Sequence, residues 1–108
     1  MEARLPTVPA AKAHGDPVVV RDGLKVVRLT IPAGVTVPEH ASNVDVVVTV
    51  VRGRGSFTYE GKTHPLSPGT VIDLAPKVRH ALAAEGEELE LVVTHARLSA
   101  GAAPSCGA

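Results

Sequence analysis

The sequence predicts an all-β sandwich or barrel with little or no helix, and three observations support this class. Turn residues are frequent, with 10 glycines and 9 prolines in 108 residues. Valine, whose branched side chain packs well on a pleated sheet, occurs 18 times and supplies most of the apolar bulk. Short apolar runs recur with turn signals between them about every 8–12 residues, as in sandwiches and barrels.

In the first half of the chain, strand signals begin at residue 18. Residues 18–21 and 24–31 flank Asp22-Gly23, a dipeptide typical of a two-residue hairpin turn. Residues 35–40 form the next short strand. Residues 44–52 are the longest β-branched run, and they are apolar on both faces. We therefore predict a central strand there that is buried on both faces.

In the second half, turns that contain glycine or proline separate five further strands. These are expected at residues 56–60, 63–66, 70–74, 80–84 and 89–98. The alanine-rich run 80–84 is too short to stand alone as a helix, so we interpret it as a strand. The glutamate-rich turn that follows predicts an antiparallel hairpin with His80 opposite Val93. His95 would then be a diagonal neighbour of His80.

The chain length suggests a single domain. We expect an alanine- and proline-rich N-terminal arm over residues 1–17, one barrel over residues 18–98 and a small-residue tail over residues 99–108. The β-prone edge at residues 18–20 predicts that residues 1–20 pack against a second copy in a homodimer.

Composition argues against several classes of protein. Eleven basic residues balance eleven acidic ones without clusters, so a nucleic-acid partner is not expected. Without a long apolar run or a leader-like start, neither membrane insertion nor export is expected. The single cysteine, Cys106, fits a reducing cytoplasm, and we interpret it as a free surface thiol.

The order of turns and histidines resembles the cupin superfamily. That family's first motif reads G-x5-H-x-H-x3,4-E-x6-G, and here Gly34 is followed by five residues and then His40, with Gly53 closing the segment. Its second motif ends in P-x-x-x-H, which matches the stretch from Pro76 to His80. Over residues 24–97 the resemblance implies a double-stranded β-helix, or jelly-roll barrel. It also implies that such chains are commonly dimers.

The same resemblance implies four metal ligands, but this chain departs from the pattern. His40 and His80 match the first and last ligands, whereas Ser42 replaces the second histidine and Val46 replaces the glutamate. Serine is a poor ligand for a divalent metal and valine is none. Asp45 is predicted not to substitute, because strand alternation points it to the opposite face from Val46.

Residues outside the four ligand positions are also candidates for the site. Arg79, which precedes His80, is expected at the barrel rim, where it would bind a carboxylate. His95 shares the inward parity of Leu91 and Val93, and we hypothesise that it joins His40 and His80 in a three-histidine cluster. His14 is expected in solvent, and a structural role is favoured for His64.

Three functions remain open. The favoured one is a barrel that binds a small organic ligand in its interior, with His40 and His80 as polar anchors and Ser42 and Arg79 nearby. The second is a metal-dependent dioxygenase or isomerase that holds one divalent ion (Fe, Mn, Ni or Zn) on His40, His80 and His95. The third is a catalytically inert structural or regulatory barrel. Whether the chain is an enzyme is left open by its sequence.

Overall fold

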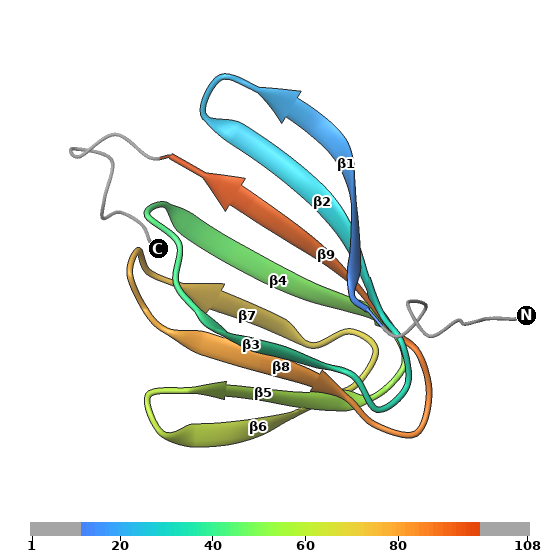
Figure 1. Cartoon of the computed structure of the whole chain (residues 1–108). Coiled ribbons are helices and arrows are strands. Elements are labelled where there is room, and N and C mark those ends of the chain that lie inside the picture. The colour runs from blue at the N-terminus through green and yellow to red at the C-terminus, as the bar shows by residue number, and fades with distance from the viewer. Residues whose placement is uncertain (1–11, 98–108) are drawn as a thin grey trace, which may run out of the picture.

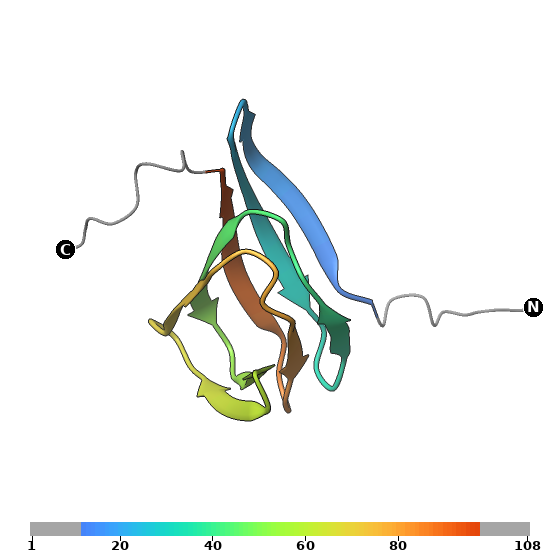
Figure 2. The same cartoon turned by 90° about the vertical axis from the view of Figure 1, so that its left-hand side faces the viewer.

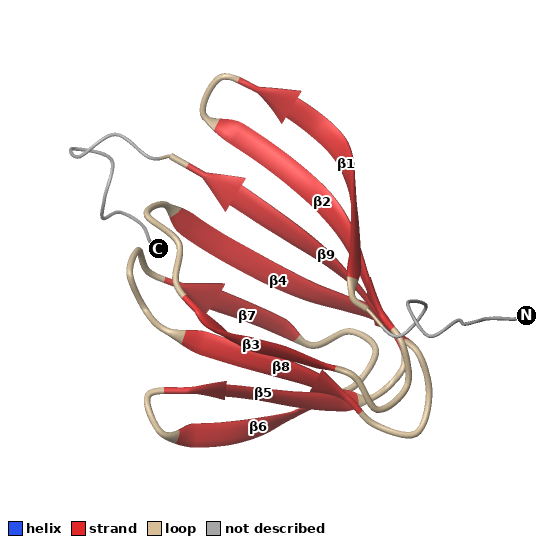
Figure 3. Ribbon diagram, viewed as in Figure 1, coloured by secondary structure: helices blue, strands red, loops and turns tan. Residues whose placement is uncertain are grey.

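The computed structural model describes residues 12–97. Within that range the chain forms strands and no helix (Figure 1, Figure 3). The strands are β1 (His14–Arg21), β2 (Leu24–Ile31), β3 (Thr36–His40), β4 (Asp45–Arg52), β5 (Gly55–Tyr59), β6 (Lys62–Leu66), β7 (Val71–Leu74), β8 (His80–Ala84) and β9 (Leu89–Ala96). The predicted all-β class is confirmed. Cys106 and most of the predicted arm and tail lie outside the described residues, and the division into arm, barrel and tail stays a prediction.

The nine strands form two antiparallel sheets that face each other (Figure 2). The five-stranded sheet has the order β1-β2-β9-β4-β7, and the four-stranded sheet has the order β3-β8-β5-β6. Because consecutive strands repeatedly change sheet, residues far apart in the sequence become neighbours. This is the topology of a jelly roll. Within residues 12–97 there is no helix of the length and apolarity that a membrane crossing requires.

The core fills one end of the space between the sheets. Ile31, Phe57, Leu89 and Leu91 are fully buried there. Burial decreases along β9 toward its C-terminal end, where Val93 and His95 are only partly covered. The opposite end of the barrel is therefore less tightly filled, and the candidate site lies at that end.

The first strand begins earlier than the sequence indicated. We expected it at residue 18, but β1 starts at His14 and includes Pro17. The strand lies at the edge of its sheet, where the N–H that proline lacks need not pair with a neighbour. The β1–β2 register shifts between Pro17 and Val19. The predicted β1–β2 hairpin itself is confirmed.

β4 is central, as predicted, because it lies between β9 and β7. Its expected burial on both faces is wrong, however. Val46, Val48 and Val50 are buried, whereas the alternate positions are partly exposed and Val51 is 48% exposed. In the described part of the chain no second layer covers the outer face of this sheet.

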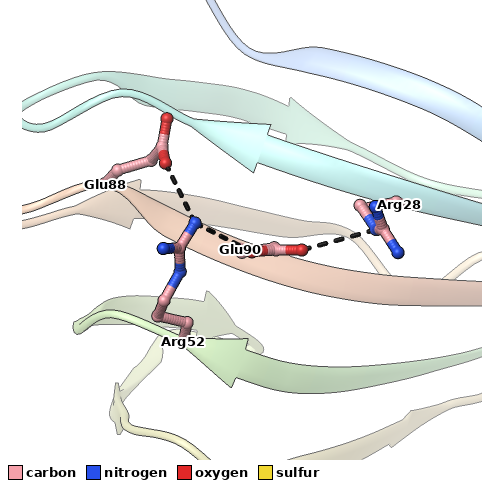
Figure 4. A network of polar contacts seen from close by, with 4 residues as sticks. All are labelled: Arg28, Arg52, Glu88 and Glu90. Atoms are coloured by element: carbon pink, nitrogen blue, oxygen red, sulfur yellow. Dashed lines mark hydrogen bonds and ion pairs between the residues drawn. The ribbon is translucent and has the colours of Figure 1, made fainter.

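A small ion-pair network crosses that outer face (Figure 4). The carboxylate of Glu90 on β9 lies 3.4 Å from Nε of Arg28 on β2 and 3.0 Å from Nη2 of Arg52 at the end of β4. Arg52 also reaches Glu88, at 3.3 Å. Glu90 thus links the two strands that flank β9.

The predicted hairpin between residues 80–84 and 89–95 is wrong. β8 pairs with β3 and β5 in one sheet, whereas β9 pairs with β2 and β4 in the other. The glutamate-rich turn crosses between the sheets, so His80 and Val93 are not cross-strand partners. His80 is instead opposite His40 and Tyr59.

Candidate functional site

A cavity of about 220 Å³ lies between the two sheets at the loosely filled end of the barrel. Seven apolar side chains and four polar ones line it. They are Val27, Leu29, Val37, Val46, Val48, Leu82 and Val93, with His40, Ser42, His80 and His95. The polar residues come from strand ends or the β3–β4 loop. In Figure 1 the ends of β3 and β9 and the starts of β4 and β8 meet at one side of the barrel. The cavity is therefore apolar in its depth and polar at its mouth.

His40 and His80 are direct neighbours in this cavity. They are cross-strand partners on β3 and β8, and their ring centroids are 4.3 Å apart at an interplanar angle of 62°. His80 is 5% exposed, and Phe57 stacks on its ring at 5.6 Å. His40 is more exposed. One ring is thus fixed by the core, and the other stands toward solvent.

Backbone carbonyls orient both rings in the same way. Nδ1 of His40 donates to the carbonyl of Pro38 at 2.9 Å, and Nδ1 of His80 donates to the carbonyl of Val78 at 2.9 Å. Because a carbonyl only accepts, Nδ1 must carry the proton in each ring. In the neutral tautomer this leaves Nε2 as a hydrogen-bond acceptor. The cavity mouth therefore carries two adjacent acceptor nitrogens.

Burial favours the uncharged form of two of the cavity histidines, His80 and His95. Desolvation lowers the pKa of His80, and the charges of His40 and His95 lower it further, while its bond to Val78 works in the opposite direction. Desolvation also lowers the pKa of His95, with a further contribution from the ammonium group of Lys25. Nδ1 of His95 is buried without a hydrogen-bond partner in the described part of the chain.

Ser42 and Val46 occupy the two positions where the family motif has further ligands. The Ser42 hydroxyl accepts a hydrogen bond from the backbone N–H of Val44 at 3.2 Å. The backbone carbonyl of Ser42 accepts another from the backbone N–H of Lys77 at 2.7 Å. Ser42 therefore ties the β3–β4 loop to the segment before β8. Val46 faces the cavity and is 2% exposed, whereas Asp45, on the alternate face of β4, does not line it.

The remaining sequence candidates lie elsewhere. The Arg79 side chain is 65% exposed, does not line the cavity, and pairs with Glu39 at 3.2 Å. His14 is exposed and pairs with Asp16. His64 stacks on Tyr59, with centroids 5.2 Å apart. None of these three residues contributes to the cavity wall.

His95 reaches the cavity by a route that the sequence analysis did not foresee. It projects from β9 in the five-stranded sheet, opposite Lys25 and Val46, rather than from a hairpin with β8. The apolar lining from β2 was also missed, although the alternation of Val27 and Leu29 along that strand carried the signal.

The donor set supports only part of a metal centre. Over residues 12–97, no three His, Cys, Asp or Glu side chains are grouped so that they could hold one ion. Catalytic zinc sites use three protein ligands. The two imidazoles of His40 and His80 have the carbonyl-anchored orientation of metal-bound histidines, but by themselves they fall short of that set.

The class of protein follows from this arrangement. Two facing antiparallel sheets in jelly-roll order, with an internal cavity, define a small β-barrel of the double-stranded β-helix type. The sequence model of the cupin domain family matches residues 27–96, well over half of the chain. The chain belongs to the cupin family.

Solved structures share this fold. A proposed mannose-6-phosphate isomerase from Ralstonia eutropha JMP134 is 26% identical, with a TM-score of 0.76, over 85% of this chain and 91% of that one. A cupin superfamily protein from Desulfitobacterium hafniense DCB-2 is 17% identical, with a TM-score of 0.75, over 91% and 84%. KdgF from Halomonas sp. is 23% identical, with a TM-score of 0.70, over 80% and 82%. No curated protein sequence matches the chain.

Proposed function

We propose that this cupin domain binds a small, mostly apolar organic molecule in the cavity between its sheets. In the bound state, Nε2 of His40 and Nε2 of His80 accept hydrogen bonds from a polar group of the ligand. The observation that carries this proposal is the division of the cavity into an apolar interior and a mouth with two oriented acceptor nitrogens. Mostly apolar pockets with a few placed polar groups are the usual form of ligand sites.

The cavity volume limits the size of the ligand. A water molecule occupies about 30 Å³ in the liquid, so a cavity of 220 Å³ has the volume of roughly seven water molecules. A molecule with about seven to ten non-hydrogen atoms matches that volume. For a ligand of this size we expect a Kd on the order of 10 μM to 1 mM.

A pair of variants tests occupancy of the cavity. Val93 lines the cavity, and its neighbour Val92 has the alternate parity on β9 and does not. With 1-hexanol as the probe, followed by ¹H–¹⁵N NMR titration, Val93→Phe should weaken binding at least tenfold. Val92→Phe should leave binding unchanged.

The result also separates this proposal from an inert barrel. If wild-type protein does not bind the probe, or if the two phenylalanine variants weaken binding equally, the cavity is not the binding site. Circular dichroism of both variants establishes that the sheets are intact, so a loss confined to Val93→Phe reports on the cavity.

The alternative is a divalent ion (Fe, Mn, Ni or Zn) in a metal-dependent enzyme. The orientation of His40 and His80 favours it, and the incomplete donor set opposes it. Metal analysis of protein expressed in metal-replete medium decides between them. Near-stoichiometric metal that is lost in His80→Ala would favour the alternative, whereas only traces of metal in both proteins would favour the organic ligand.

A further inference from the structure

A second hollow, of about 350 Å³ and open to solvent, adjoins the mouth of the cavity. It is lined by Val20, Arg21, Gly23, Leu24, Lys25, Val44, His95 and Arg97. His95 also lines the cavity, so this ring forms part of the wall of both spaces. The two spaces therefore share a wall at His95, and a ligand that occupies both must pass this ring.

The charged residues that line this hollow are all basic. Three of its lining residues, Arg21, Lys25 and Arg97, are cationic, and none is a carboxylate. Nη2 of Arg97 bonds Oδ1 of the neighbouring Asp22 at 3.2 Å. Over residues 12–97, neither Arg21 nor Lys25 has an ion-pair partner. We call these three residues the cationic rim.

Lys25 lies where the rim meets the cavity. It is the cross-strand partner of His95, and directly opposed residues of an antiparallel pair project from the same face of the sheet. That face is the one that carries Val27 and Leu29 into the cavity. The ammonium charge also lowers the pKa of His95, which is consistent with their proximity.

We infer that the cationic rim binds the carboxylate of the ligand, and that the ligands of this domain are small monocarboxylic acids. The inference rests on the proposed function, because the apolar body of the acid lies in the cavity. Lys25 receives the carboxylate on the inner face of the five-stranded sheet, and Arg21, which is opposite Leu24 at the end of the β1–β2 hairpin, adds positive charge at the edge of the hollow. His40 and His80, on the opposite sheet, accept from a hydroxyl group where the acid carries one.

Three probes and three variants test this inference. Hexanoate, 1-hexanol and acetate are titrated at low salt, because an exposed cationic site is screened at higher ionic strength. Hexanoate should bind about two- to fivefold more tightly than 1-hexanol, as expected for an exposed ion pair. Lys25→Gln should reduce this preference, and Arg21→Gln/Lys25→Gln should abolish it. Neither change should alter binding of 1-hexanol. Lys62→Gln, on β6 and outside the rim, is the matched control.

The outcomes separate the two proposals. If 1-hexanol binds as tightly as hexanoate, or if the double variant keeps the preference, the rim inference is overturned and the cavity proposal stands. If acetate binds as tightly as hexanoate, the anion is held without the cavity, which contradicts the proposed function. If none of the probes binds, both proposals fail.

Discussion

Replacing Gly53 with alanine tests how closely the end of β4 approaches the start of its neighbour β9 at the buried end of the barrel. Gly53 follows β4 with a φ of +95°, and a Cβ added there would overlap the carbonyl oxygen of Glu88 and lie 2.9 Å from Cα of Leu89. Both neighbours are backbone atoms, so relief requires one strand to move. Gly69 is the matched control, because its φ is +93° but no atom lies within 4 Å of the added Cβ.

The expected losses follow from these contacts. A side chain in this left-handed region costs about 1–2 kcal/mol at either position. The reduced freedom of the unfolded chain offsets about 0.4–1 kcal/mol of that cost. At Gly53 the overlap adds about 1–3 kcal/mol, as overpacking does in well-filled cores. We therefore expect Gly53→Ala to lower the free energy of unfolding by about 3 kcal/mol, and Gly69→Ala by about 1 kcal/mol.

Urea unfolding followed by circular dichroism measures both values. The difference of about 2 kcal/mol should appear at an unchanged m-value, and Tm should differ by about 10 °C between the variants. Equal losses at the two glycines would refute the reasoning, because the conformational cost alone would then account for both.

Three further predictions concern charge and assembly. The pKa of His80 is lowered in the folded protein, so as pH falls toward and below about 6.5 this side chain takes up a proton more readily in the unfolded chain than in the folded one. The free energy of unfolding should therefore decline from pH 7.5 to 5. The decline should be less steep in His80→Gln. An identical decline in both proteins would contradict this. Val18 and Val20 are 60% and 68% exposed on β1, at the edge of its sheet. We therefore expect light scattering to give the mass of a dimer for the wild-type protein and of a monomer for Val18→Lys/Val20→Lys. A monomer mass for the wild-type protein would contradict the predicted dimer. Glu90→Gln should cost about 0.5–1 kcal/mol by breaking the outer-face network, and no loss would show that the network adds nothing.

Local pattern was sufficient to predict the all-β class, the β1–β2 hairpin and the opposite parity of Asp45 and Val46. Each depends on residues close together in the sequence, where alternation and turn chemistry act directly. The motif at Gly34 and His40 and the stretch from Pro76 to His80 carried the resemblance to the family, which the match over residues 27–96 bears out.

The pairing of strands was not available from local pattern. A turn rich in glutamate after residue 84 suits either a hairpin or a crossing between sheets, and only long-range packing selects the crossing. The position of His95 opposite Lys25 depends on that choice. The sequence pattern therefore indicated that His95 faces inward but not which residues it meets.

The central claim is that His40 and His80 present two unprotonated Nε2 atoms to a ligand in the cavity. Imidazole ¹⁵N chemical shifts at pH 8, recorded with and without 1-hexanol, test it most directly. The account predicts that both rings carry their proton on Nδ1, as the bonds to Pro38 and Val78 require, and that the Nε2 resonances shift when the alcohol binds. A proton on Nε2 of either ring, or Nε2 resonances that stay unchanged while 1-hexanol binds, would contradict it.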